Sequence, residues 1–94
     1  MYGTIVNMKI KTGHEQQISR ILDAEPADGA IAWFVMKPDE QDAELVGVVI
    51  FESKEAYLAN ANNPSQHQTF LKLMDHLESE PTWTDGEFLL SKIV

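Results

Sequence analysis

Three histidines are the side chains of this sequence best suited to proton transfer, because imidazole changes charge near neutral pH. At about 100° per residue, His67 lies about 60° from Phe70 and about 20° from Met74 around a helix, at the border of an apolar face. His67 is therefore predicted to face a pocket as a base or hydrogen-bond donor. The alternative is an ordinary surface histidine near a helix N-terminus. His14 and His76 are placed less favourably, and the three histidines lack the paired spacing of a helical metal site, so no metal is expected.

Aromatic and amide side chains could complete such a pocket. Two polar candidates lie one helical turn apart and could both reach the oxygen of a ligand. Core packing, or the plugging of a domain edge or dimer seam, explains the aromatic members equally well. The candidate pocket residues are Tyr57, Asn60, Phe70, Met74, Trp33 and Trp83.

Composition limits the classes of protein that can hold these residues. The 94 residues, 44% of them hydrophobic, fit one domain spanning 1–94. The formal charge of −8 makes nucleic acid and anionic membrane surfaces improbable partners. Cysteine is absent, so thiolate chemistry and disulfides are excluded. No apolar run is long enough to span a membrane or resembles a signal segment, and a cytoplasmic protein is expected.

The N-terminal half alternates between strand and helix patterns. Residues 2–10 have the period-2 pattern of a strand, and a helix with apolar residues at helical spacing should follow and end before Pro26. Two apolar runs, 31–36 and 45–51, are separated by a proline and an acidic stretch. They are predicted to form a hairpin of two strands.

The C-terminal half predicts a divided helix and one more strand. Ser53 is a plausible cap for the first helical segment, and Ser65 with Gln68 matches a capping box that opens the second. A turn at Asp85-Gly86 then precedes the alternating residues 88–94, which are expected to form the last strand. The predicted fold is α+β and ferredoxin-like, in the order βαββαβ, with helices on one face of a four-stranded antiparallel sheet.

The central hairpin is apolar on both faces. Trp33 and Val35 alternate with Phe34 and Met36, so helices on one side leave an apolar face uncovered on the other. A homodimer joined through this sheet face is therefore predicted. The alternative is a monomer in which the second helical segment or the C-terminal tail folds over the open face.

Four stretches carry a resemblance to a known family: Lys11-Thr12-Gly13-His14-Glu15, 48–57, 60–66 and 80–87. They resemble the antibiotic biosynthesis monooxygenase family, whose members are dimeric ferredoxin-like α+β barrels. The resemblance spans nearly the whole chain. It implies oxygenation of a small aromatic or quinol-like molecule without flavin or metal, so no cofactor is expected. The alternative is a non-catalytic module that binds a small apolar or aromatic ligand or a partner protein.

Haem binding or degradation is a second alternative, since the family includes haem-degrading members. These use an asparagine on the first strand together with a tryptophan and a histidine from the second helical region. Aligned through the turn at Gly13, that asparagine falls on Val6, whereas Asn7 points to the other face. No tryptophan occurs between Lys54 and Glu80, so the haem-degrading pattern is incomplete.

Overall fold

The computed structural model describes residues 1–24 and 29–94. The elements follow one another as β1 (Tyr2–Met8), α1 (Glu15–Ala24), β2 (Ala30–Met36), β3 (Leu45–Phe51), α2 (Lys54–Ala61), α3 (Pro64–Met74) and β4 (Thr82–Glu87). This order confirms the predicted βαββαβ fold and the division of its second helix. Within the described ranges, no helix is long and apolar enough to cross a membrane.

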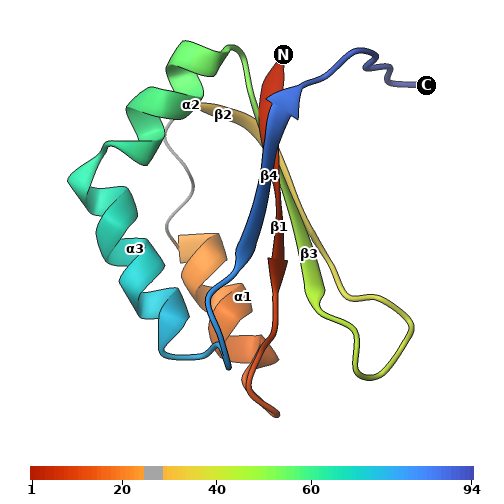
Figure 1. Cartoon of the computed structure of the whole chain (residues 1–94), viewed down its shortest axis with the longest axis vertical. Coiled ribbons are helices and arrows are strands. Elements are labelled where there is room, and N and C mark those ends of the chain that lie inside the picture. Colours follow the sequence, from red (N-terminus) through yellow and green to blue (C-terminus); the bar gives the residue numbers. More distant parts are fainter. Residues whose placement is uncertain (25–28) are drawn as a thin grey trace.

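The four strands form one antiparallel sheet in the order β2-β3-β1-β4. All three helices lie on one side of it (Figure 1). Because successive strand residues point to opposite faces, Thr4, Val6 and Met8 of β1 are buried under the helices, whereas Ile5 is exposed on the other face. The sheet therefore has a helix-covered face and an open face.

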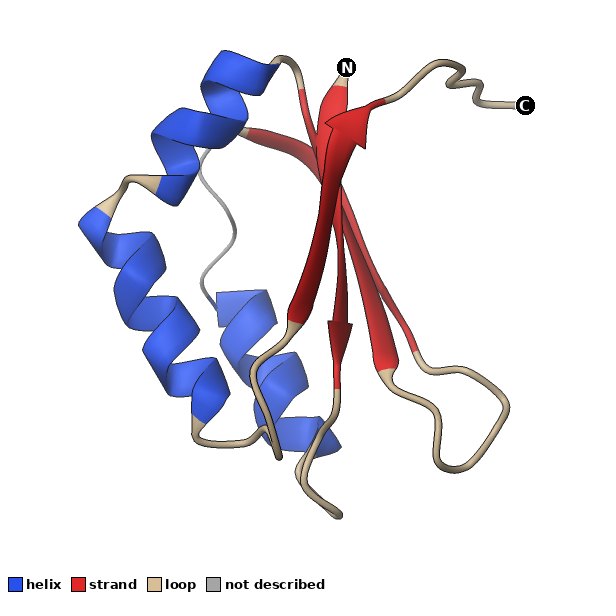
Figure 2. Ribbon diagram, viewed as in Figure 1, coloured by secondary structure: helices blue, strands red, loops and turns tan. Residues whose placement is uncertain are grey.

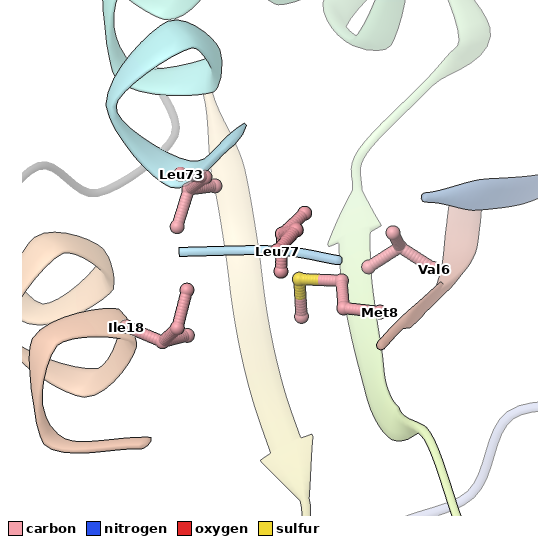
Figure 3. Packing of buried hydrophobic residues seen from close by; sticks show 5 residues of the cluster. All are labelled: Val6, Met8, Ile18, Leu73 and Leu77. Carbon is pink, nitrogen blue, oxygen red and sulfur yellow. The ribbon is translucent and has the colours of Figure 1, made fainter. Parts of the chain in front are cut away.

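The core lies between β1 and the helices. Its buried cluster consists of Ile18 of α1, Val6 and Met8 of β1, Leu73 of α3 and Leu77 in the chain after α3 (Figure 3). Helical spacing explains the α1 contribution, since Ile18 is 1% exposed and the next inward positions pack against the same cluster. The core therefore fills one end of the space between sheet and helices.

The start of α3 differs from the predicted capping box. Asn63 is the N-cap, and its side-chain Oδ1 accepts a hydrogen bond from the Ser65 backbone N at 2.9 Å. Pro64 occupies the first turn, where its missing N–H costs nothing and its fixed φ favours the helix. The prediction of Ser65 with Gln68 as a capping box is therefore wrong, because the proline begins the helix earlier.

The last strand is Thr82–Glu87, and the prediction of a strand over 88–94 is wrong. β4 pairs with β1 from Asn7 opposite Thr82 to Tyr2 opposite Glu87, which includes the Asp85-Gly86 pair that was expected to turn. One further backbone hydrogen bond joins the Phe88 N to the Met1 O at 3.0 Å. None of the described strands pairs with 88–94, so alternation alone could not make this segment a strand.

Apolar side chains remain uncovered on the open face. Ile5, Phe34 and Met36 are 39%, 62% and 57% exposed, which confirms the two-sided apolar character of the sheet. The C-terminal tail, 88–94, leads away from the strands, on the opposite side from α2 (Figure 2). Its Leu89 and Val94 are fully exposed. Neither the second helical segment nor the tail therefore covers this face.

Candidate ligand pocket

A cavity of about 500 Å³ lies between the helix-covered face of the sheet and the helices α2 and α3. All four strands contribute to its lining, and most of the lining side chains are apolar. Its volume falls in the range of about 300 to 1,000 Å³ that is usual for small-molecule sites. The cavity, called the pocket below, can therefore hold a small ring compound.

Aromatic side chains from three elements line the pocket. Trp33 comes from β2, Phe70 from α3 and Trp83 from β4. The rings of Phe70 and Trp83 lie 6.5 Å apart between centroids at an interplanar angle of 43°, in the range of attractive aromatic pairs. Trp83 is 50% exposed, so this pair stands at the margin of the cavity. The structure thus brings these three aromatic candidates together around the pocket, and the fourth, Tyr57, lines it as well.

Helix α2 supplies Tyr57 and Asn60, the two predicted polar residues. The Ser53 hydroxyl caps this helix by accepting a hydrogen bond from the Ala56 backbone N at 3.1 Å. The Tyr57 ring packs between Tyr2 and Phe51, at centroid distances of 5.2 and 5.4 Å. These contacts fix the direction of the phenol, which lines the pocket together with Asn60.

Polar groups gather where α2 meets β1 and β4. Thr4 and Asp85 are direct partners in the β1–β4 ladder, and both line the pocket with Tyr57 and Asn60. We call these four residues the polar end. Burial raises the pKa of Tyr57 to about 12, and a hydrogen bond to the Asp85 carboxylate adds to the increase. The nearby Thr4 hydroxyl lowers the pKa of Tyr57 slightly and so offsets part of this increase. The Thr4 Oγ1 atom has no hydrogen-bond partner among the described residues.

Two polar atoms of the polar end are buried without a hydrogen-bond partner among the described residues. They are Thr4 Oγ1 and Asn60 Oδ1, in side chains that are 4% and 8% exposed. Such orphan groups are rare in folded proteins, because each loses its hydrogen bonds to water without replacement. Both residues line the pocket, so a bound molecule can supply the hydrogen-bond partners that these two atoms lack.

The other two predicted site residues lie further from the polar end. His67 lines the pocket but is exposed, in the first turn of α3, with its backbone N donating to the Asn63 O at 3.3 Å. Met74 does not line the pocket and packs against the core cluster instead. It lies one turn beyond Phe70, at the end of α3 where the space is filled by the core. The structure therefore removes Met74 from the candidate pocket.

Asn7 lies on the open face of β1, as its register predicts. It pairs with Val46 of β3 and Thr82 of β4, and the neighbouring Val6 and Met8 are the ones that line the pocket. The first strand therefore presents valine, methionine and threonine to the cavity. Val6 therefore occupies the place of the asparagine of haem-degrading members, and Asn7 is turned away from the cavity.

Thr4 and Asp85 are pocket residues that the sequence reasoning missed. Thr4 carried a usable signal, since it is a polar residue on the apolar face of a period-2 strand. Asp85 carried none, because an Asp-Gly pair is a typical turn sequence and its place opposite Thr4 depends on the pairing of β1 with β4.

The fold is shared with solved structures from several organisms. A candidate antibiotic biosynthesis monooxygenase from Deinococcus radiodurans matches with a TM-score of 0.79 and 13% identity, over 100% of this chain and 98% of that chain. Rv0793 from Mycobacterium tuberculosis matches with a TM-score of 0.77 and 16% identity, over 96% of both chains. A candidate antibiotic biosynthesis monooxygenase from Nitrosomonas europaea matches with a TM-score of 0.76 and 13% identity, over 96% of this chain and 100% of that chain.

No protein-family model matches the sequence, and no curated protein matches it. Identities this low show a common fold and leave activity to be argued from the pocket. The chain therefore has the fold of structures named as antibiotic biosynthesis monooxygenases, which confirms the resemblance seen in its sequence.

Proposed function

We propose that this protein is a homodimeric, cofactor-independent monooxygenase that acts on a small aromatic or quinol-like molecule held in the pocket. The observation that carries the proposal is a largely apolar cavity of about 500 Å³ whose polar end includes two buried polar atoms without a hydrogen-bond partner among the described residues. It occurs in the fold of candidate antibiotic biosynthesis monooxygenases, which supports the same reading. Such a cavity can hold a ring compound in one orientation.

The reaction needs no outside reductant if the substrate forms a stabilised anion that passes an electron to dioxygen. In the simplest case an activated ring CH₂ group becomes a carbonyl. One atom of dioxygen enters the product, and the other leaves as water with the two hydrogens of that carbon. The protein then has to orient the substrate, exclude bulk water and accept one proton.

His67 is the proposed base, because it is the imidazole that borders the pocket. Replacing it with alanine should lower kcat about 100-fold, the usual contribution of one general base. Gln68→Ala is the matched control, since Gln68 is the exposed neighbour of His67 and does not line the pocket. Equal turnover by wild type and His67→Ala would remove His67 from the mechanism.

Oxygen consumption with a panel of dihydroquinones and polyphenols tests the activity. At least one compound should be consumed faster than without protein, and labelled dioxygen should add one oxygen atom to the product. A panel in which compounds raise the melting temperature but no oxygen is consumed would overturn the monooxygenase and favour the non-catalytic binding module. One observation favours that second candidate: apart from exposed His67, the titratable side chains among the described lining residues are Tyr57, whose pKa is raised to about 12, and Asp85.

The homodimer is proposed from the open face. Ile5, Phe34 and Met36 would be covered by the same face of a second chain, which is the common symmetric solution for such a patch. Light scattering at micromolar concentration should therefore give twice the 10.6 kDa mass of the chain. A mass of one chain across that range would overturn the dimer and leave the pocket argument unchanged.

A further inference from the structure

The polar end of the pocket contains an orphan oxygen that can only accept a hydrogen bond. Asn60 Oδ1 is buried and unpartnered among the described residues, and the Asp85 carboxylate contributes further acceptor oxygens. Asp85 contributes to the raised pKa of Tyr57, so these two groups lie close together. The Thr4 hydroxyl is unpartnered and can donate or accept. A molecule bound here meets acceptors that need a hydrogen.

The charge of the lining also restricts the ligand. Among the described residues that line the pocket, none is lysine or arginine, and Asp85 is the one carboxylate. An anionic ligand would lose its hydration next to a like charge, with no cation to compensate. The pocket therefore disfavours carboxylates and phosphates.

We infer that the pocket selects uncharged ring compounds that carry a hydroxyl or N–H donor, with Asn60 and Thr4 as the specificity-determining anchors and Asp85 as the group that rejects anions. The inference rests on the pocket proposed above as the substrate site and narrows its substrate class to neutral phenols, quinols and their N–H analogues. The donor satisfies Asn60 Oδ1, and the ligand oxygen accepts from the Thr4 hydroxyl.

Three probes with the same ring body separate the possibilities: naphthol offers a neutral donor, methoxynaphthalene keeps the oxygen without the donor, and naphthoate is an anion. Calorimetric titration should give an affinity for naphthol about tenfold higher than for either of the others, the usual ratio for one hydrogen bond in a dry site. Equal affinities, or no binding of naphthol at millimolar concentration, would overturn the inference.

Variants assign the selectivity to residues. Thr4→Val keeps the shape of the side chain, and Asn60→Leu removes the orphan acceptor. Asn60→Leu should lower naphthol affinity about tenfold while leaving methoxynaphthalene unchanged, because only naphthol donates to Asn60 Oδ1. Thr4→Val removes the donor to the ligand oxygen and should therefore lower both affinities. Asp85→Asn should raise naphthoate affinity. Melting curves check that the variants fold. If Asn60→Leu does not fold, the three probes on the wild-type protein still decide the donor preference, and Thr4→Val still tests the polar end.

Matched controls come from the open face, which the ligand does not touch. Thr84→Val repeats the threonine change on β4 opposite Ile5, and Asn7→Leu repeats the asparagine change on β1. Both should leave all three affinities unchanged, and naphthol affinities that fall equally in the controls would overturn the assignment. Naphthol selectivity without oxygen consumption would remove the monooxygenase and keep this inference. Oxygen consumption without a preference for the donor-bearing probe would keep the monooxygenase and overturn this inference.

Discussion

The imidazole rings of His14 and His76 face each other, with their Nδ1 atoms 2.9 Å apart and their centroids 5.2 Å apart. The pair joins the loop before α1 to the chain just after α3. Two more contacts cross the same junction, from the Lys11 backbone N to the His76 O and from Lys11 Nζ to the Asp75 O, both at 3.0 Å. The histidines that the sequence set aside therefore close one end of the fold.

This pair should be measurable as a coupled contribution to stability. One ring must donate and the other accept, so His14→Ala or His76→Ala alone should each cost about 1 kcal/mol of unfolding free energy. The double variant should cost less than the sum of the two, by about 0.5 kcal/mol or more. Urea unfolding of the four proteins checks this, and strictly additive losses would contradict a direct bond between the rings.

Tyr57 should make stability fall in strong alkali. Its pKa is raised from 10.0 to about 12 in the folded protein, so the unfolded chain loses the phenol proton first as the pH rises. The contribution of Tyr57 is therefore complete below pH 10.0 and is lost between there and about pH 12. Tyr57→Phe removes this loss, and the stability difference between wild type and variant should shrink over that interval. Parallel pH profiles would contradict the raised pKa.

Thr4→Val should stabilise the unliganded protein. The change removes a buried hydroxyl that has no partner among the described residues and keeps the shape of the side chain. A gain of about 1 kcal/mol is expected, which raises Tm by about 4 to 8 °C in a domain of this size. Thermal unfolding measures it, with Thr84→Val as the exposed control. A loss of stability would mean that a bound water already satisfies this hydroxyl.

Phe34→Glu should separate the proposed dimer. The ring is 62% exposed on the open face, where a second chain would bury it, and a carboxylate there would be desolvated without a partner. Leu71→Glu is the matched control, because Leu71 is 47% exposed but belongs to α3 on the other side of the sheet. Sedimentation should give the mass of one chain for Phe34→Glu only. An unchanged mass for both variants would place the contact elsewhere.

Sequence reasoning succeeded where periodicity reports burial directly. Ile18 on α1 and the alternating residues of β1 follow from patterns that depend on a single element. Tyr57 and Asn60 could be nominated for the same reason, since one helix carries both. Periodicity did not reveal β4, because every residue of Thr82–Glu87 is exposed and the segment shows no apolar alternation. Thr4 and Asp85 meet only through the β1–β4 register, which no local pattern reveals.

Edge position and exposure together should make β4 prone to fraying. It bonds to β1 along one side only, and none of its six residues is buried, although Trp83 and Asp85 are walls of the pocket. Local unfolding of this strand would therefore open the cavity without disturbing the core, and would give small molecules a path into it. A ligand that contacts both Trp83 and Asp85 should slow amide hydrogen exchange in β4 before it does so in the other strands. Exchange in β4 would then report whether the pocket is occupied.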